Sequence, residues 1–177
     1  TPGIAVVGLI EGALPCVQST FAKAGLEVAL LGGPGTWMGG STYLSVIHGL
    51  QRGAPPPVDY ATERALHDRV RALIRDGIAV VAHDLSDGGL AVALAEMTSS
   101  GMGGAFTLPG EGDETARLFG EDHGRIVVAY DPKHRDAVGG IVLGTTGGDR
   151  LTVGPVDVAV SEIEAVWRGT FEDWANA

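Results

Sequence analysis

Short apolar runs of strand length alternate along the chain with segments whose apolar residues recur at helical spacing. One helix is expected to begin at Asp59 or Thr62 and to end at Gly77, and another covers Leu90 to Met97. The apolar runs typical of buried strands are Ile4–Leu9, Leu26–Leu31, Ile78–Ala82 and Arg125–Tyr130. This succession predicts a domain of the α/β (α+β) class, with helices packed on a mixed sheet.

The rest of the chain continues the same pattern. Further strands are expected near residues 104–108, 141–145, 150–154 and 156–160. Shorter helices are expected after Ser41, over residues 113–119 and from Pro132. Ser161 and Glu164 form a capping box for a last helix. That helix is expected to place four apolar residues on or near one face: Ile163, Val166, Trp167 and Trp174.

Composition narrows the classes of protein that fit. A chain of 177 residues with 45% hydrophobic content is expected to form a single domain over residues 1–177. The net charge of -10 argues against nucleic acid as a partner, and the apolar runs are too short to cross a membrane. The single cysteine, Cys16, rules out an internal disulfide and suits the cytoplasm. Because the chain begins at Thr1 rather than Met, we expect it to be part of a larger polypeptide.

The turn after the strand at 78–82 carries candidate ligand-binding residues. Two glycines at the start of the next helix leave main-chain amides uncovered, and the helix N-terminus favours an anion there. The same pattern also fits an ordinary strand-to-helix turn, capped by Ser86 or Asp87 and with glycines for tight packing. The candidates for binding a nucleotide or substrate are His83, Asp84, Ser86, Asp87, Gly88 and Gly89.

A second polar cluster precedes the strand at 125–130. Its candidate residues are Gly120, Glu121, Asp122 and His123. Acidic and histidine side chains can bind a metal or move a proton, but consecutive residues point in opposite directions, which argues against one shared metal. The alternative is a polar loop in which Arg125 pairs with a carboxylate.

The segment from Gly32 to Gly40 is so rich in glycine that it must be a loop. It has no lysine and no phosphate-loop motif, so we expect a mobile segment over residues 33–40 that orders against a partner domain. Exposed Trp37 and Met38 would favour that contact. The interdomain candidates are Gly39, Gly40 and Ser41.

Several of these stretches, in order, resemble one enzyme family. AHDLSDGGLAVALAE (Ala82–Glu96) resembles the signature of the C-terminal domains of formylglycinamidine ribonucleotide amidotransferase synthetase subunits. GLEVALLGG, GGSTYL and LFGEDHGR resemble further elements of that family, and the first ten residues resemble the segment that precedes the domain. GGSTYL points to the second of the family's two fused halves. Aminoimidazole ribonucleotide synthetase and selenophosphate synthetase share the fold and remain one alternative. A purely structural docking domain is the other.

The resemblance implies a role in purine biosynthesis. The complete enzyme is an ATP- and magnesium-dependent ligase that converts formylglycinamide ribonucleotide and glutamine-derived ammonia to the amidine. Its partners would be the N-terminal domains of the same subunit, a glutaminase and a small bridging subunit. The family's GES-Q element contacts substrate in the first half, whereas Asp122 and His123 stand here in place of Ser and Gln. The domain alone is therefore expected to be inactive, to have no catalytic or metal-ligating residue and to hold no cofactor tightly.

Overall fold

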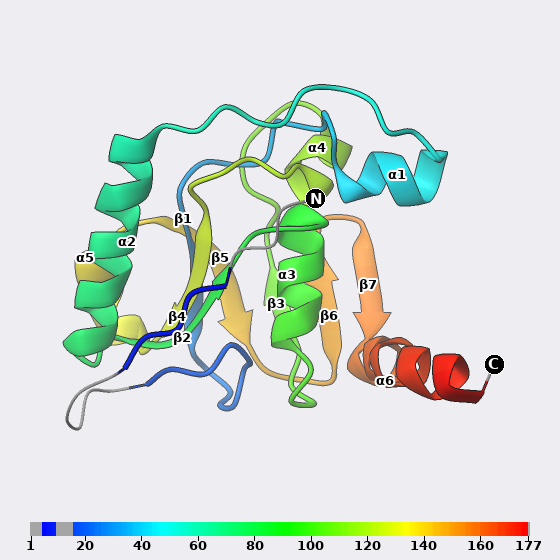
Figure 1. Cartoon of the computed structure of the whole chain (residues 1–177). Helices are drawn as coiled ribbons and strands as arrows, with labels where there is room; N and C mark the ends of the chain where they lie inside the picture. The colour runs from blue at the N-terminus through cyan, green and yellow to red at the C-terminus, as the bar shows by residue number, and fades with distance from the viewer. Residues whose placement is uncertain (1–4, 10–15, 177) are drawn as a thin grey trace.

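The computed structural model describes residues 5–9 and 16–176 (Figure 1). The strands are β1 (Glu27–Leu31), β2 (Ala79–Asp84), β3 (Gly104–Phe106), β4 (Ile126–Tyr130), β5 (Ile141–Thr146), β6 (Arg150–Val153) and β7 (Val156–Ala159). The helices are α1 (Thr42–His48), α2 (Tyr60–Arg75), α3 (Gly89–Met97), α4 (Glu114–Phe119), α5 (Arg135–Val138) and α6 (Val160–Asn176), with a 3-10 turn, η1 (Pro132–His134).

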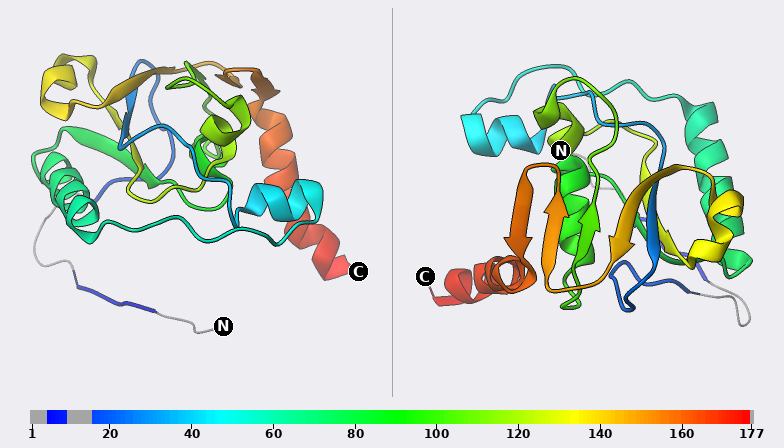
Figure 2. Two further views of the ribbon diagram at one scale, coloured as in Figure 1. Left: turned by 90° about the horizontal axis from the view of Figure 1, so that it is seen from above. Right: turned by 180° about the vertical axis from the view of Figure 1, so that it is seen from behind.

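The seven strands form one mixed sheet in the order β2-β4-β1-β5-β3-β6-β7. β3 and β6 run parallel, whereas every other neighbouring pair is antiparallel. Helices cover the sheet on both faces, and β1 and β4 lie between α2 and α3 when the molecule is seen from above (Figure 2). The predicted mixed sheet with packed helices is confirmed.

β1 is the centre of the packing because all five of its residues are buried. Successive side chains of a strand point to opposite faces, so Val28 and Leu30 join the apolar cluster that includes α3. Ala29 and Leu31 point the other way, into the cluster that includes α2 and α5. A strand buried on both faces reads as a continuous apolar run, which explains why the sequence identifies it so clearly.

Polar side chains start the helices where the sequence predicts. The carboxylate of Asp59 accepts hydrogen bonds from the amides of Ala61 (2.9 Å) and Thr62 (3.2 Å) at the start of α2. Ser41 caps α1 and Asp113 caps α4 in the same way. Each cap satisfies an amide that the helix itself leaves without an acceptor.

The predicted strand Ile4–Leu9 is wrong over residues 5–9, and Ile4 lies outside the described residues. Residues 5–9 form no strand, and the side chains of Val6, Val7 and Leu9 are at least 90% exposed. A strand needs a neighbour that accepts its hydrogen bonds, and at the edge strand β2 it is Gln18 that bridges to Val81 instead.

The start and the apolar face of α6 also differ from expectation. The helix begins at Val160, whose amide donates to the carbonyl of Asp149 (2.8 Å), one residue before the expected capping box. Val166 and Trp167 are 74% and 55% exposed, whereas Ile163, nearer the start of the helix, packs against the core. The side chain of Trp174 lies outside the described part of the chain.

A buried charge links β1 to β4 and α5. Glu27, 3% exposed, accepts hydrogen bonds from the Tyr130 hydroxyl (2.7 Å) and from Nε of Arg135 (2.9 Å). The bond from Arg135 lowers the pKa of Glu27 although burial acts against it. Burial, together with the bond to Glu27, raises the pKa of Tyr130 above its ordinary value. Glu27 is thus a satisfied structural anion.

We expect Tyr130→Phe to lower the free energy of unfolding by about 1–3 kcal/mol, because it removes a hydrogen bond to a buried carboxylate. Urea denaturation at neutral pH measures the change. The matched control is Tyr60→Phe, since Tyr60 is 82% exposed and its loss should change stability by less than about 0.5 kcal/mol. Equal effects of the two substitutions would contradict this role of Tyr130.

Candidate functional site

Three segments that are distant in sequence meet at one end of the sheet. They are the loop before α1, the turn between β2 and α3, and the segment between α4 and β4. In Figure 1, α1, α4 and the start of α3 lie together at the top of the molecule. All the candidate binding residues predicted from the sequence lie in these segments or at the adjoining ends of β2 and α3.

Glu121 lies in the segment between α4 and β4 and is hydrogen-bonded to the other two segments. Its Oε1 accepts hydrogen bonds from the amide of Gly88 and from the amide of Thr42, each at 2.8 Å. Gly88 is the residue before α3 and Thr42 opens α1, so one carboxylate accepts the amide next to the start of α3 and the first amide of α1. The positive end of each helix dipole favours this negative charge.

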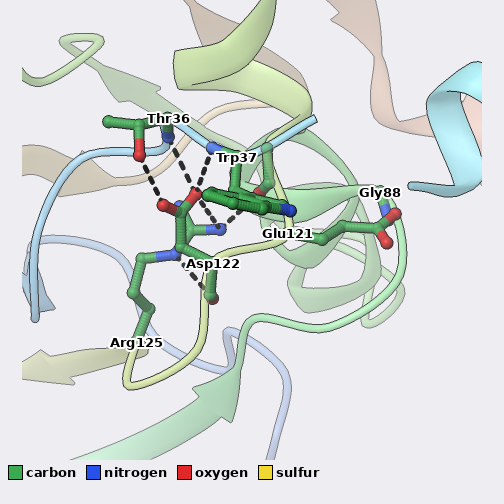
Figure 3. A network of polar contacts seen from close by, with 7 residues as sticks. Thr36, Trp37, Gly88, Glu121, Asp122 and Arg125 are labelled. Carbon is green, nitrogen blue, oxygen red and sulfur yellow. Dashed lines mark hydrogen bonds and ion pairs between the residues drawn. The ribbon is translucent and has the colours of Figure 1, made fainter. Parts of the chain in front are cut away.

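Asp122 holds the loop before α1. Its Oδ2 accepts from the amides of Thr36 (2.8 Å) and Trp37 (2.9 Å), and its Oδ1 accepts from the Thr36 hydroxyl at 2.6 Å (Figure 3). Burial acts to raise the pKa of this carboxyl. The bonds from Thr36 and Trp37, with the nearby Arg125, nevertheless bring the pKa below its usual range.

Arg125 is buried beside Asp122, with only 1% of its side chain exposed. Its Nη2 lies 4.0 Å from Oδ2 of Asp122 and also donates to the carbonyl of Gly120. Its Nε donates to the carbonyl of Asp122 at 3.2 Å. Desolvation lowers the pKa of Arg125, and the two carboxylates oppose that shift. The alternative prediction, a polar loop in which Arg125 pairs with a carboxylate, is therefore confirmed.

The turn from His83 to Gly89 stands where the sequence places it, at the carboxyl end of β2 and before α3. The expectation of uncovered amides is wrong, because the amide of Gly88 donates to Glu121 and that of Gly89 to the carbonyl of Ser86 (3.1 Å). Gly88 is the residue before the helix, so neither Ser86 nor Asp87 caps it. A carboxylate from another segment replaces the local cap.

Both glycines of the turn are required by backbone conformation and by packing. Gly88 has φ +77°, and a Cβ there would stand 2.3 Å from Cγ2 of Val92. Gly89 has φ +64°, and its Cβ would stand 2.5 Å from the carbonyl oxygen of Gly120. Positive φ disfavours residues with a Cβ, so the prediction of glycines for tight packing is confirmed.

His83 has a partner that the sequence did not reveal. Its Nε2 lies 3.3 Å from Oε2 of Glu96 on α3, and its Nδ1 lies 2.6 Å from the carbonyl oxygen of Asp84. The histidine is 15% exposed and thus held on both sides of its ring. The residues of the candidate set left exposed to solvent are Asp84, Ser86, Asp87 and His123.

The glycine-rich loop is tied to the chain that follows α1. The amide of Gly40 donates to the carbonyl of Arg52 (2.8 Å), and Nε1 of Trp37 donates to the carbonyl of Ala54 (2.9 Å). Ser41 is 1% exposed and serves as the cap of α1. Trp37 and Met38 are half-buried rather than exposed, which corrects the sequence-based expectation. Mobility of residues 33–40 stays a prediction.

The described residues contain neither a metal-type cluster nor a membrane-spanning helix. Within residues 5–9 and 16–176, no three His, Cys, Asp or Glu side chains lie together as a metal site would require. Over the same residues, no helix has the length and apolar character needed to cross a membrane.

Comparison with known proteins identifies the family. The model of AIR synthase related protein, C-terminal domain, matches residues 23–146. The chain belongs to this family. It is 42% identical to the phosphoribosylformylglycinamidine synthase subunit PurL of Rhodospirillum rubrum, over 97% of this chain and 25% of that protein. The PurL subunit of Methylocella silvestris is 37% identical over 100% of this chain and 26% of its own length. The chain thus spans about a quarter of the relatives it matches.

Solved structures share the fold. Thermotoga maritima PurL complexed with FGAR superposes with a TM-score of 0.71 and 19% identity, over 84% of this chain and 29% of that one. A chain in the crystal structure of a HypE–HypF complex superposes with a TM-score of 0.55 and 21% identity, over 78% of this chain and 52% of that one. These matches confirm the predicted family fold.

We expect Gly88→Ala to destabilise this family member by about 2–4 kcal/mol, from the left-handed backbone and from the contact with Val92 together. Urea denaturation provides the measurement. The control is Gly49→Ala, because Gly49 also has positive φ (+63°) but has no heavy atom within 4 Å of a built Cβ. Only the backbone cost, about 1–2 kcal/mol, should remain there. Val92→Ala should partly rescue Gly88→Ala but not Gly49→Ala, and equal losses without rescue would contradict the packing role.

Asp122 should also make stability depend on pH. Its folded-state pKa is lowered, so its stabilising contribution is complete above the unfolded value of about 3.9 and is lost as pH falls through the folded value. The unfolding free energies of the parent chain and Asp122→Asn should therefore differ at pH 6 to 8 and converge below about pH 4. Denaturant titrations at several pH values measure the difference. A gap that persists unchanged at about pH 2 would show that the charge of Asp122 contributes nothing.

Proposed function

We propose that this chain is the C-terminal domain of the second half of the synthetase subunit of phosphoribosylformylglycinamidine synthase. The observation that carries the proposal is the 42% identity to a PurL subunit across 97% of the chain. The complete enzyme would be a cytoplasmic, magnesium-dependent C–N ligase of purine biosynthesis. It would use ATP and glutamine-derived ammonia to convert formylglycinamide ribonucleotide to formylglycinamidine ribonucleotide.

The domain by itself would be non-catalytic and would complete an auxiliary nucleotide site with an N-terminal domain of the same subunit. Glu121 and Asp122 support the first statement, since both carboxylates are committed to main-chain amides. Exposed Asp84 and Asp87 support the second, because they lie at the end of β2 and in the turn after it, where the three segments meet. Carboxylates there suit magnesium or a ribose hydroxyl better than a bare phosphate. A glutaminase and a small bridging subunit would complete the assembly.

Replacing the matching quarter of the Rhodospirillum rubrum subunit with this chain tests the assignment. We expect the chimera, given formylglycinamide ribonucleotide, ATP, magnesium and ammonia, to form the amidine within about tenfold of the parent rate, or about 1.4 kcal/mol in activation free energy. The isolated chain should form none. Product formation, followed by chromatography, is the measurement.

A matched chimera that carries the corresponding domain of HypE provides the control, since it has the fold without the close sequence identity. That chimera should be inactive. A soluble chimera of this chain that forms no product, or a HypE chimera that is equally active, would contradict the assignment to this enzyme.

A purely structural domain is the second candidate, favoured by the internal use of Glu121 and Asp122. Asp84→Asn with Asp87→Asn in the active chimera distinguishes the two functions. An auxiliary nucleotide site predicts weaker ADP binding in equilibrium dialysis, by about tenfold or more for a lost carboxylate contact, with melting temperature unchanged. The control is Asp68→Asn with Asp76→Asn, two exposed carboxylates on and after α2. Unchanged ADP binding would favour the structural role.

A further inference from the structure

The donors around Asp122 resemble those that proteins use to bind phosphate. Two consecutive amides, Thr36 and Trp37, and the Thr36 hydroxyl point at one carboxylate, and the guanidinium of Arg125 lies behind it (Figure 3). Main-chain amides, a hydroxyl and an arginine together favour oxyanions, because each bond to the anion is assisted by its charge. Here the anion that these donors bind is the carboxylate of Asp122, a side chain of the protein itself.

Arg125 has more donor capacity than Asp122 uses. Its Nη1 is buried and has no hydrogen-bond partner among the described residues, although the side chain is only 1% exposed. Nη1 faces the same loop, since a Cβ built on Gly35 would stand 3.1 Å from it. A buried donor without an acceptor costs free energy, and an anion with more acceptor oxygens than a carboxylate would satisfy it.

Two glycines leave room beside the Asp122 carboxylate and the Arg125 guanidinium. A Cβ on Gly120 would stand 3.1 Å from both Oδ2 of Asp122 and the amide nitrogen of Thr36. Gly35 takes the corresponding position beside Arg125. Any other residue at either position would occupy the volume beside the anion.

We propose that Thr36, Trp37 and Arg125 form a binding site for a phosphate-type oxyanion, and that the carboxylate of Asp122 fills this site from within the chain. While Asp122 is in place, an incoming phosphate meets both an occupied set of donors and a like charge. Removal of the carboxylate opens the site. This site involves only residues of this chain and inorganic phosphate. Its test therefore does not depend on the assignment of the chain to an enzyme.

Phosphate binding to Asp122→Ala tests the proposal. We expect inorganic phosphate to shift the amide NMR signals of Thr36 and Trp37 saturably in Asp122→Ala, with an affinity at least about tenfold above that of the parent chain. Sulfate should compete for the same site. Adding Arg125→Lys to Asp122→Ala should weaken the binding, because an ammonium group cannot replace the planar guanidinium.

Asp59→Ala is the matched control, since it also removes one carboxylate that accepts two main-chain amides but has no arginine behind it. Its phosphate affinity should equal that of the parent chain. Asp122→Asn provides a variant of nearly unchanged shape. Should either variant at position 122 be largely unfolded, phosphate must raise its unfolding midpoint in urea more than it raises that of Asp59→Ala, because a ligand of the folded state stabilises it.

Two results would overturn the proposal. One is a parent chain that binds phosphate through the Thr36 and Trp37 amides as tightly as Asp122→Ala does. The other is a set of position-122 variants that gain neither phosphate-induced shifts nor phosphate-dependent stability beyond those of Asp59→Ala. In that case Asp122 only tethers the loop.

Discussion

The bonds from the carboxylates of Glu121 and Asp122 to main-chain amides hold one end of this molecule together. Consecutive side chains diverge, so Glu121 reaches the starts of α1 and α3 while Asp122 reaches Thr36 and Trp37. Arg125, whose Nη2 lies 4.0 Å from Oδ2 of Asp122, compensates part of the charge of both carboxylates. Loops that share no strand pairing thereby acquire fixed relative positions. Because the side chains of Glu121 and Asp122 point in different directions, they do not share a metal, and each carboxylate has its own set of amide donors.

The sequence predicts the sheet and its helices wherever local pattern and burial agree. β1 is apolar from Val28 to Leu31 because both of its faces are buried, and α2 begins after Asp59 because that side chain caps it. The sequence-based prediction fails where the structure of a segment depends on which other parts of the chain pack beside it. Residues 5–9 have the apolar content of a strand, but the edge of β2 is bridged by Gln18 instead. Trp167 has the spacing of a core residue, but it is 55% exposed.

The sequence identifies the three segments that form the candidate site, but not the hydrogen bonds that connect them. Glycines and acidic residues mark each segment, and all of the marked segments do meet. The pairings depend on residues far apart in sequence, such as Asp122 with Thr36 and Glu121 with Thr42. His83 with Glu96 adds a pair between a strand and the following helix. In a chain with 22 acidic residues, no local feature distinguishes a carboxylate that caps a distant loop from one that is solvated.

α1 shows how far this end of the molecule depends on polar contacts. None of its residues is buried, and Val46 and Ile47 are largely exposed, so hydrophobic burial does not fix its position. What holds it is the bond from its first amide to Glu121 and the stacking of Tyr43 on Phe119, with ring centroids 4.9 Å apart. A seven-residue helix has too few internal bonds to be stable alone. Its geometry is therefore set by the same carboxylate that orders the start of α3, and a change at Glu121 is transmitted to both helices together.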